Sequence, residues 1–299
     1  MSHRTTPSRL PPIAAILLLA VFPRVARAQT VDGVAREPRP TLFQWSYGTS
    51  FGGGPPGRDE PLVGDRPDFT ESTATVGRGV VQLETGYTYF FDEEHGEKTA
   101  GHSFPEPLLR VGLLAEWLEF RIGWNYAEKK GIGPGGSTVE TGSEDLYLGL
   151  KLAMTPQEGI LPEMALIPQM TVPVGDPPFT AGEVLPGLNW VYGWEIGDCI
   201  SLAGSTQGNG AVDDVTGRRY LEMGQSMVIG YSLLDRLGAF TEWFAFFPHS
   251  ADTAKPEHYF DGGFTFSVTD DLQLDVRAGL GLNDAAGDYF VGAGSIVRF

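Results

Sequence analysis

The sequence predicts an all-β protein, a transmembrane antiparallel up-and-down β-barrel of about twelve strands. Three observations favour this fold class. Apolar residues recur at every second position over segments of about 9–13 residues. These segments match the roughly 9–11 residues of a tilted strand that crosses a bilayer, whereas strands of globular sheets mostly have about 5–6 residues. The connections between the segments alternate between long and short, as expected for exterior loops and periplasmic turns.

Composition excludes several other classes of protein. The chain has 299 residues, and its hydrophobic fraction of 41% is too high for a disordered chain. A single Cys excludes a disulfide scaffold and a Cys-based zinc module. The net charge is −17 and there is no run of Lys or Arg, so we expect neither nucleic acid nor anionic lipid as the main partner. The longest apolar run, Ile13–Phe22, is too short for a helix that crosses a bilayer.

Residues 1–28 have the pattern of a secretory signal peptide. Arg4 and Arg9 precede the apolar run, and Ala26-Arg27-Ala28 provides small residues at the spacing of a cleavage site. The prolines that flank the run disfavour the alternative, a buried N-terminal helix. We expect secretion through the inner membrane and cleavage after Ala28. Because the signal carries four Arg and no acid, the mature chain has 17 basic and 38 acidic residues, a net charge of −21.

Residues 29–64 are rich in Pro and Gly, with the run Gly52–Gly57 near their end. This composition does not support a regular element, so we expect a flexible lead-in. Residues 65–78 follow it as a periplasmic segment or a plug, and the barrel is expected to occupy residues 79–299.

The alternation is clearest where one face of a strand is charged. In 143–153, every even position from 146 to 152 is Leu, whereas the odd positions include Asp145 and Lys151. Acids, Arg and Gly on this second face indicate a polar lumen, which favours a barrel over a soluble sandwich of the same period. The twelve predicted strands are residues 79–91, 104–115, 117–127, 143–154, 162–173, 187–197, 199–207, 219–232, 237–248, 258–268, 271–282 and 289–299.

Connection lengths support this division of the chain. The predicted long connections follow the odd-numbered strands and are 92–103, 128–142, 174–186, 208–218, 249–257 and 283–288. Those after even-numbered strands are mostly tight, such as Glu116 alone and Asp198 alone. Aromatic residues near strand ends fit an interfacial girdle.

The last predicted strand ends on Phe299. An aromatic residue at this place resembles the signal by which bacterial outer-membrane barrels are recognised for assembly. We therefore expect the barrel assembly machinery to be a partner, although an ordinary last strand is the alternative.

Several motifs resemble those of one bacterial outer-membrane β-barrel family. The first is Asp65–Ser72, which is followed after a short gap by Val81–Tyr87. The other matching segments are 144–151, 172–176, 240–243, 261–263, 273–275 and 292–299. The family is described as a transporter family of the meta-pathway of phenol degradation. The resemblance covers residues 65–299 and implies a barrel that transports small or aromatic compounds, with no catalytic residues.

The segment Asp65–Ser72 is the strongest candidate for a specific role. The charges and the apolar side chain that define the plug candidate are Asp65, Arg66, Asp68, Phe69 and Glu71. The hypothesis is that they enter the lower barrel mouth as a plug, where Arg66 would pair with a lumen acid such as Glu84 or Glu119. A barrel of twelve strands leaves room for a narrow pore or a small plug. A plain solvated turn is the alternative.

Seven acids and five bases are expected to face the lumen. They are Glu84, Arg110, Glu119, Arg121, Asp145, Lys151, Glu195, Glu222, Glu242, Asp275, Arg277 and Arg298. Charges of both signs would orient polar solutes and set a weak ion preference. The alternative is that they pair across strands and close the interior.

We expect no enzymatic activity, no cofactor and no metal site. No HExxH motif is present, and His258 near Ser250 is the only faint pair for a membrane-embedded hydrolase.

The predicted function is a passive channel or transporter in the bacterial outer membrane for small solutes, aromatic or hydrophobic ones among them. Its expected partners are outer-membrane lipid, the assembly machinery and a small-molecule solute, with no nucleic acid. The main alternative is a structural or surface-interaction barrel with a closed lumen, and a membrane-embedded hydrolase is a third.

Overall fold

The computed structural model describes residues 41–43, 62–94 and 96–299. The predicted signal peptide (1–28) and most of the predicted lead-in (29–64) lie outside the described residues. Within the described ranges, no helix is long and apolar enough to span a membrane.

Antiparallel β-strands form a single sheet that contains all the regular structure of the described chain. In order they are β1 (Val81–Glu94), β2 (Glu97–Phe104), β3 (Leu108–Gly112), β4 (Leu118–Gly123), β5 (Tyr126–Gly133), β6 (Gly136–Ser143), β7 (Leu146–Thr155), β8 (Glu163–Val172), β9 (Leu185–Ile196), β10 (Ile200–Val212), β11 (Arg219–Leu234), β12 (Leu237–His249), β13 (Glu257–Thr269), β14 (Leu272–Gly281) and β15 (Tyr289–Arg298). The β-branched and aromatic residues that recur along them suit a pleated sheet with two different faces.

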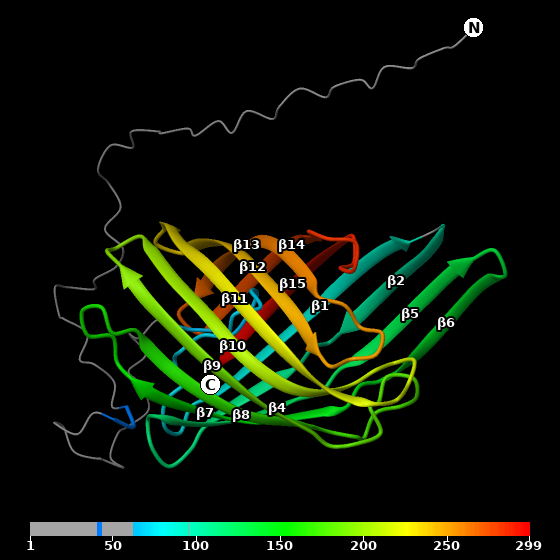
Figure 1. The fold of residues 1–299 in the computed structure, drawn as a ribbon. Coiled ribbons are helices and arrows are strands. Elements are labelled where there is room, and N and C mark those ends of the chain that lie inside the picture. The colour runs from blue at the N-terminus through cyan, green and yellow to red at the C-terminus, as the bar shows by residue number, and fades with distance from the viewer. Residues whose placement is uncertain (1–40, 44–61, 95) are drawn as a thin grey trace, which may run out of the picture.

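The sheet closes into a barrel because its first strand pairs with its last. The register of β1 with β15 runs from Gln82 opposite Arg298 to Phe91 opposite Tyr289, and Figure 1 shows the two strands side by side. In three places, two successive strands are the two halves of a single crossing of the barrel wall. These pairs are β2 and β3, β4 and β5, and β6 and β7. Counting each pair once reduces the fifteen strands to twelve crossings, so the predicted all-β barrel of twelve strands is confirmed.

The three interruptions lie beside one another in the barrel wall, at 105–107, 124–125 and 144–145. Prolines at 105 and 107 lack the N–H that a ladder needs. The wall stays connected across the break, because Gly86 N donates to Pro105 O at 2.7 Å and Glu144 N donates to Asn125 O at 2.9 Å. Beyond it β2, β5 and β6 continue as a three-stranded arm, whose outer strand β6 pairs only with β5 (Figure 1).

Two of the segments predicted as exterior loops are β-hairpins, so the prediction of loops there was wrong. Residues 92–103 are mostly the β1–β2 hairpin, and residues 128–142 are mostly the β5–β6 hairpin. Every residue of β6 from 136 to 141 is exposed. Because both faces of this hairpin are polar, it carries no apolar alternation by which the sequence could have marked it as strand.

The two faces of the barrel differ in the way the alternation predicted. Large apolar side chains are exposed on the outside, among them Phe264 and Val276, which are 52% and 50% exposed. Charged side chains such as Glu84 and Arg110 are fully buried inside. This inverts the arrangement of a water-soluble protein and fits a barrel with lipid outside and a polar interior.

A charge placed on the outer face should weaken the fold in a bilayer. Val276 lies midway along β14, so Val276→Arg should lower the free energy of unfolding by about 2–4 kcal/mol. The measurement is urea unfolding in lipid vesicles, followed by tryptophan fluorescence. Val215→Arg, in the loop between β10 and β11, is the control and should change the stability by less than about 0.5 kcal/mol. Equal losses in both variants would contradict a lipid-facing position for Val276.

Candidate functional site

Residues 65–76, which we name the inserted segment, lie inside the barrel before β1. They contact inward-facing residues on opposite sides of the wall, from Glu84 of β1 and Lys151 of β7 to Asn189 of β9 and Glu242 of β12. The segment has no strand period, and Pro67 fixes its backbone near the start. Asp65 closes it into a loop, because its Oδ1 accepts from Ser72 N at 2.8 Å and from Ser72 Oγ at 2.6 Å.

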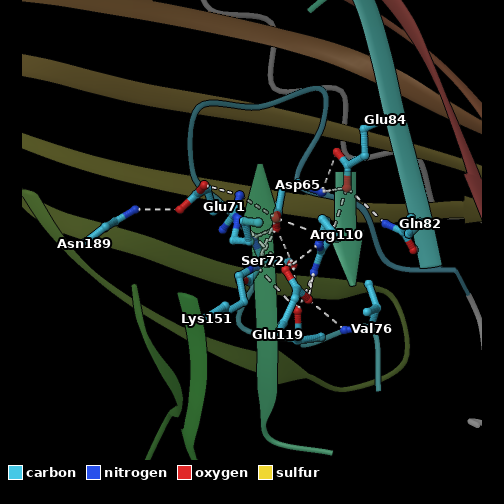
Figure 2. Close-up of polar contacts among 12 residues, drawn as sticks. Asp65, Glu71, Ser72, Val76, Gln82, Glu84, Arg110, Glu119, Lys151 and Asn189 are labelled. Carbon is cyan, nitrogen blue, oxygen red and sulfur yellow. Dashed lines mark hydrogen bonds and ion pairs between the residues drawn. The ribbon is translucent and has the colours of Figure 1, made fainter. Parts of the chain in front are cut away.

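One end of the inserted segment is held by a buried cluster of charges around Asp65. Its carboxylate lies 2.8 Å from Lys151 Nζ, 3.0 Å from Arg121 Nη2 and 3.3 Å from Arg110 Nη1 (Figure 2). Burial opposes ionisation of this carboxyl, but Arg110, Lys151 and Arg121 outweigh burial and lower the pKa of Asp65 below its ordinary value. Asp65 is therefore ionised and is the shared counter-ion of Arg110, Arg121 and Lys151.

The carboxylate of Asp65 offsets positive charge that is concentrated in the barrel wall. Arg110 and Arg121 are direct neighbours across β3 and β4, and like charges in that position destabilise a sheet. Glu84 and Glu119 balance part of the positive charge, with Arg110 at 3.0 Å and 2.8 Å. Both acids also accept backbone N–H groups of the inserted segment, from Asp65 and from Val76. The segment thus supplies donors and an acceptor to the same cluster.

The middle of the inserted segment is held by an acid of β12, across the lumen from the cluster around Asp65. Glu242 of β12 accepts from Phe69 N at 2.6 Å and from Thr70 N at 2.8 Å. The Phe69 ring stacks on Phe244, with 4.7 Å between the ring centroids. Burial, and then the nearby Glu242 and Asp261 carboxylates, raise the pKa of Asp68 well above its ordinary value.

Arg66 does not contact the acids that the sequence suggested. Its guanidinium lies 2.7 Å from Glu106 and 3.4 Å from Asp275 of β14. Glu84 and Glu119 are held by Arg110 instead. Arg66 thus pairs with a predicted lumen acid, Asp275, but not with the two acids given as examples, because the direction in which Arg66 leaves the segment depends on how the segment is docked.

The predicted lumen residues fall into three groups by depth. Seven are buried in the interior: Glu84, Arg110, Glu119, Arg121, Lys151, Glu242 and Asp275. Arg277 is half-buried and donates to Pro67 O at 3.0 Å and to Thr88 Oγ1 at 3.1 Å. Glu222 is also half-buried and accepts from Tyr220 Oη at 3.2 Å.

The remaining three lie near the ends of the barrel and outside the central cluster. Asp145 accepts backbone N–H groups from Gly175 and Ala181, so it fixes the 173–184 loop. Arg298 binds Asp271, in the turn between β13 and β14, at 2.8 Å. Glu195 is exposed near the end of β9.

Some interior residues escaped the sequence prediction. Asp261 is 1% exposed, and Asn189 donates to Glu71 Oε2 at 2.9 Å. Both sit at inward positions of predicted strands, so strict alternation could have found them. Glu106 could have been found in the same way, because it shares a face with Arg110 in the predicted strand 104–115, although it lies in the break between β2 and β3.

A pocket of about 260 Å³ remains between the inserted segment and the wall. Its lining residues are Asp65, Arg66, Pro67, Asp68, Glu71, Glu84, Glu106, Leu108, Arg121 and Arg277. The part of the chain that the structure describes holds no group of three or more His, Cys, Asp or Glu that could bind a metal ion. In the same part, no hydrogen bond joins Ser250 to His258, whose ring packs against Trp243 and Phe247.

Comparisons with known proteins agree with this architecture. Residues 64–299 match the family described as “Putative MetA-pathway of phenol degradation”. The fold is similar to that of an outer membrane channel from Pseudomonas putida F1, with 14% identity, 78% of this chain and 100% of that chain covered, and a TM-score of 0.62. It is also similar to the transport unit of the autotransporter AIDA-I from Escherichia coli, with 12% identity, 78% and 93% coverage, and a TM-score of 0.53. No curated protein matches the chain.

Removal of the central anion should destabilise the protein strongly. Asp65→Asn leaves Arg110, Arg121 and Lys151 buried with less negative charge, and we expect the free energy of unfolding to fall by about 3–5 kcal/mol. Urea unfolding in vesicles measures the loss. Asp252→Asn is the matched control, since Asp252 pairs with the exposed Arg218 at 3.1 Å and an exposed pair contributes about 0–1 kcal/mol. A loss no larger than that of the control would contradict the role of Asp65.

The raised pKa of Asp68 predicts that docking of the inserted segment depends on pH. An acid whose pKa rises on folding stabilises the docked state while it is protonated. That contribution is complete below its ordinary pKa of 3.8 and is lost as the pH climbs towards the raised value. The acidic groups that act on Asp68 are Glu242, Asp261 and Asp65. Arg277 is the positive charge that acts on Glu242 and Asp261.

We therefore expect protease cleavage within residues 65–76 to become faster as the pH rises. Asp68→Asn should flatten this dependence. Asp214→Asn, in an exposed loop, should leave it unchanged after correction for the activity of the protease at each pH. The same slope in all three proteins would exclude Asp68 as the titrating group.

Proposed function

The chain belongs to the family that residues 64–299 match, and on that basis we propose that it is a passive channel for small solutes in the bacterial outer membrane. The observation that carries the proposal is a closed barrel whose outer face is apolar and whose interior holds charged side chains around a pocket. A barrel that served only as a scaffold could fill its interior with apolar side chains, and this would avoid the cost of burying charge.

The proposed solutes are small and include aromatic compounds. Two features support this class. The family description names phenol degradation, and one side of the interior carries aromatic rings in mutual contact. These rings are Phe69, Phe244, Phe246, Tyr259 and Phe290. No energy-coupling step is proposed, so solutes move down their concentration gradient.

The inserted segment is proposed to restrict this pathway as a plug. It is anchored at Asp65 and at Glu242, on opposite sides of the lumen, so it crosses the space that a solute would use. The plug candidates Asp65, Phe69 and Glu71 each contact the wall. The buried charges thus have a second role besides facing the pathway, which is to hold the segment in place.

A closed barrel with a structural or surface-interaction role is the second candidate. The density of buried ion pairs around Asp65 favours it, because these contacts fill part of the interior. Both candidates include residence in the outer membrane. Both also include cleavage after Ala28 and assembly directed by Phe299.

Conductance in planar bilayers separates the two candidates. We expect the purified full-length protein to form small, ohmic channels. Deletion of residues 65–72 should increase the single-channel conductance severalfold, because it removes the anchors of the inserted segment. Deletion of residues 52–59, which are equally many, is the control and should leave the conductance unchanged.

Two results would count against this account. Equal conductance of the protein with and without residues 65–72 would contradict the plug. Absence of conductance from both would favour the closed barrel.

A further inference from the structure

We propose that Glu242 and Asp261 form a proton-binding site in the barrel wall, and that loss of its proton at alkaline pH releases the inserted segment. This site is distinct from Asp68, which belongs to the segment itself. The proton site depends only on the geometry of the wall, whereas its effect on the pathway rests on the plug of the proposed function.

The two carboxyl groups of the site face each other across neighbouring strands. Glu242 of β12 lies directly opposite Asp261 of β13, and each residue is 1% exposed. The carboxyl group of Asp261 lies within hydrogen-bonding reach of Glu242. Like charges in directly opposite positions destabilise a sheet, and two buried carboxyl groups that share a site do not both ionise. The arrangement therefore calls for a proton on one of them.

Asp261 has no other group that stabilises a negative charge by contact. Both of its carboxyl oxygens are buried and accept no hydrogen bond from the described residues. Its neighbour on β14 is Gly279, which has no side chain that could donate. Arg277 acts on Asp261 from further away, and its guanidinium donates to Pro67 O and Thr88 Oγ1 instead. A proton that joins Asp261 to Glu242 would give the buried oxygens their missing contact.

The hydrogen bonds of Glu242 indicate which of the two acids carries the proton. Glu242 accepts from Phe69 N at 2.6 Å, from Thr70 N at 2.8 Å and from Thr70 Oγ1 at 2.5 Å. Three donors favour the ionised form of a carboxyl group. Asp261 has no such donor, so it is the acid that takes the proton, and its O–H donates to Glu242. Glu242 then remains the anion that holds the inserted segment.

The charges near the pair make its proton sensitive to pH. The groups that act on the two acids are Asp68 of the inserted segment and Arg277 of β14. Asp65 and Asp275, on the same two elements, are each paired with a cation. The neighbouring side chains from β11 and β15 are the uncharged Val228, Ser226 and Phe290. Loss of the proton from Asp261 therefore adds a negative charge beside two other acids.

Release of the inserted segment relieves this charge. While the segment is docked, both acids of the pair are buried from water. Undocking lets water hydrate the two carboxylates and takes Asp68 away from them. The docked state thus binds a proton that the released state gives up, so its stability falls as the pH rises. The sign is the same as for Asp68, and each acid accounts for part of the pH dependence.

Infrared difference spectroscopy of the full-length protein in lipid vesicles tests the proton directly, because a protonated carboxyl group has its own C=O stretch. The wild type should show this band at neutral pH and lose it at alkaline pH. Asp261→Asn should reduce the band, whereas Asp68→Asn should keep part of it, because the pair in the wall is intact. Asp270→Asn is the matched control, in the exposed β13–β14 turn, and should give the wild-type spectrum.

Neutral variants of the two acids should have opposite effects on docking. Asp261→Asn supplies an N–H that can donate to Glu242 at every pH, so cleavage within residues 65–76 at alkaline pH should be about tenfold slower than in the wild type. Glu242→Gln places a donor against Phe69 N or Thr70 N, so cleavage should be faster at every pH. All rates are compared at the same pH. A purely structural role would make cleavage faster in both variants.

Several outcomes would overturn the proposal. They are no protonated-carboxyl band at neutral pH, an unchanged band in folded Asp261→Asn, complete loss of the band in Asp68→Asn, or cleavage of Asp261→Asn at alkaline pH that is no slower than that of the wild type. Heat-modifiable gel migration verifies the fold of each variant, and Asp68→Asn serves if Asp261→Asn does not fold.

Conductance in planar bilayers distinguishes failure of this site from failure of the plug. The wild-type conductance should rise at alkaline pH, and that of Asp261→Asn should rise less. A band that depends on Asp261, with slower cleavage but no effect of pH on conductance, supports the proton site and counts against the plug. A conductance that rises on deletion of residues 65–72, in a protein without the band, supports the plug and overturns the proton site.

Discussion

The carboxylate of Asp65 is the contact on which the interior of this barrel depends. The antiparallel register brings Arg110 beside Arg121, and Lys151 follows on the next strand, so the wall gathers positive charge at one depth. A buried cation without a counter-ion costs several kcal/mol, and the wall acids Glu84 and Glu119 meet only part of the need. Asp65 completes the set from outside the sheet. The wall and the segment before it are therefore one electrostatic unit.

The two sides of the lumen need opposite hydrogen-bonding partners, an acceptor on one side and donors on the other, and one short segment provides both. On the side of β3, β4 and β7 the wall offers donors, which the Asp65 carboxylate accepts. On the side of β12 the wall offers an acceptor, Glu242, to which the backbone N–H groups of Phe69 and Thr70 donate. Between the two anchors lies the pocket of about 260 Å³.

Alternation in the sequence located the inward positions well, but it did not give their depth. Glu84, Glu119, Arg121 and Lys151 face inward and meet in one cluster, whereas Asp145, Glu195 and Arg298 lie near the ends of the barrel. Depth depends on the tilt and stagger of each strand, which the local pattern of a strand does not contain. Which lumen acid pairs with Arg66 could not be predicted for a related reason, because an irregular segment carries no register with the wall. The β5–β6 hairpin was missed because, with both faces polar, it has no apolar period.

The sequence by itself determined the fold class, the twelve crossings, the family and the charged character of the interior. Each of these follows from a period of two or from motifs that are contiguous in the chain, so local information is sufficient. Only the tertiary structure decided that Asp65 meets three cations from three strands, that Arg66 turns to Glu106 and Asp275, and that a pocket lies beside the segment. These contacts join residues that are 40 to 209 positions apart. Closure of the barrel brings them together, and no local pattern encodes which inward residues then meet.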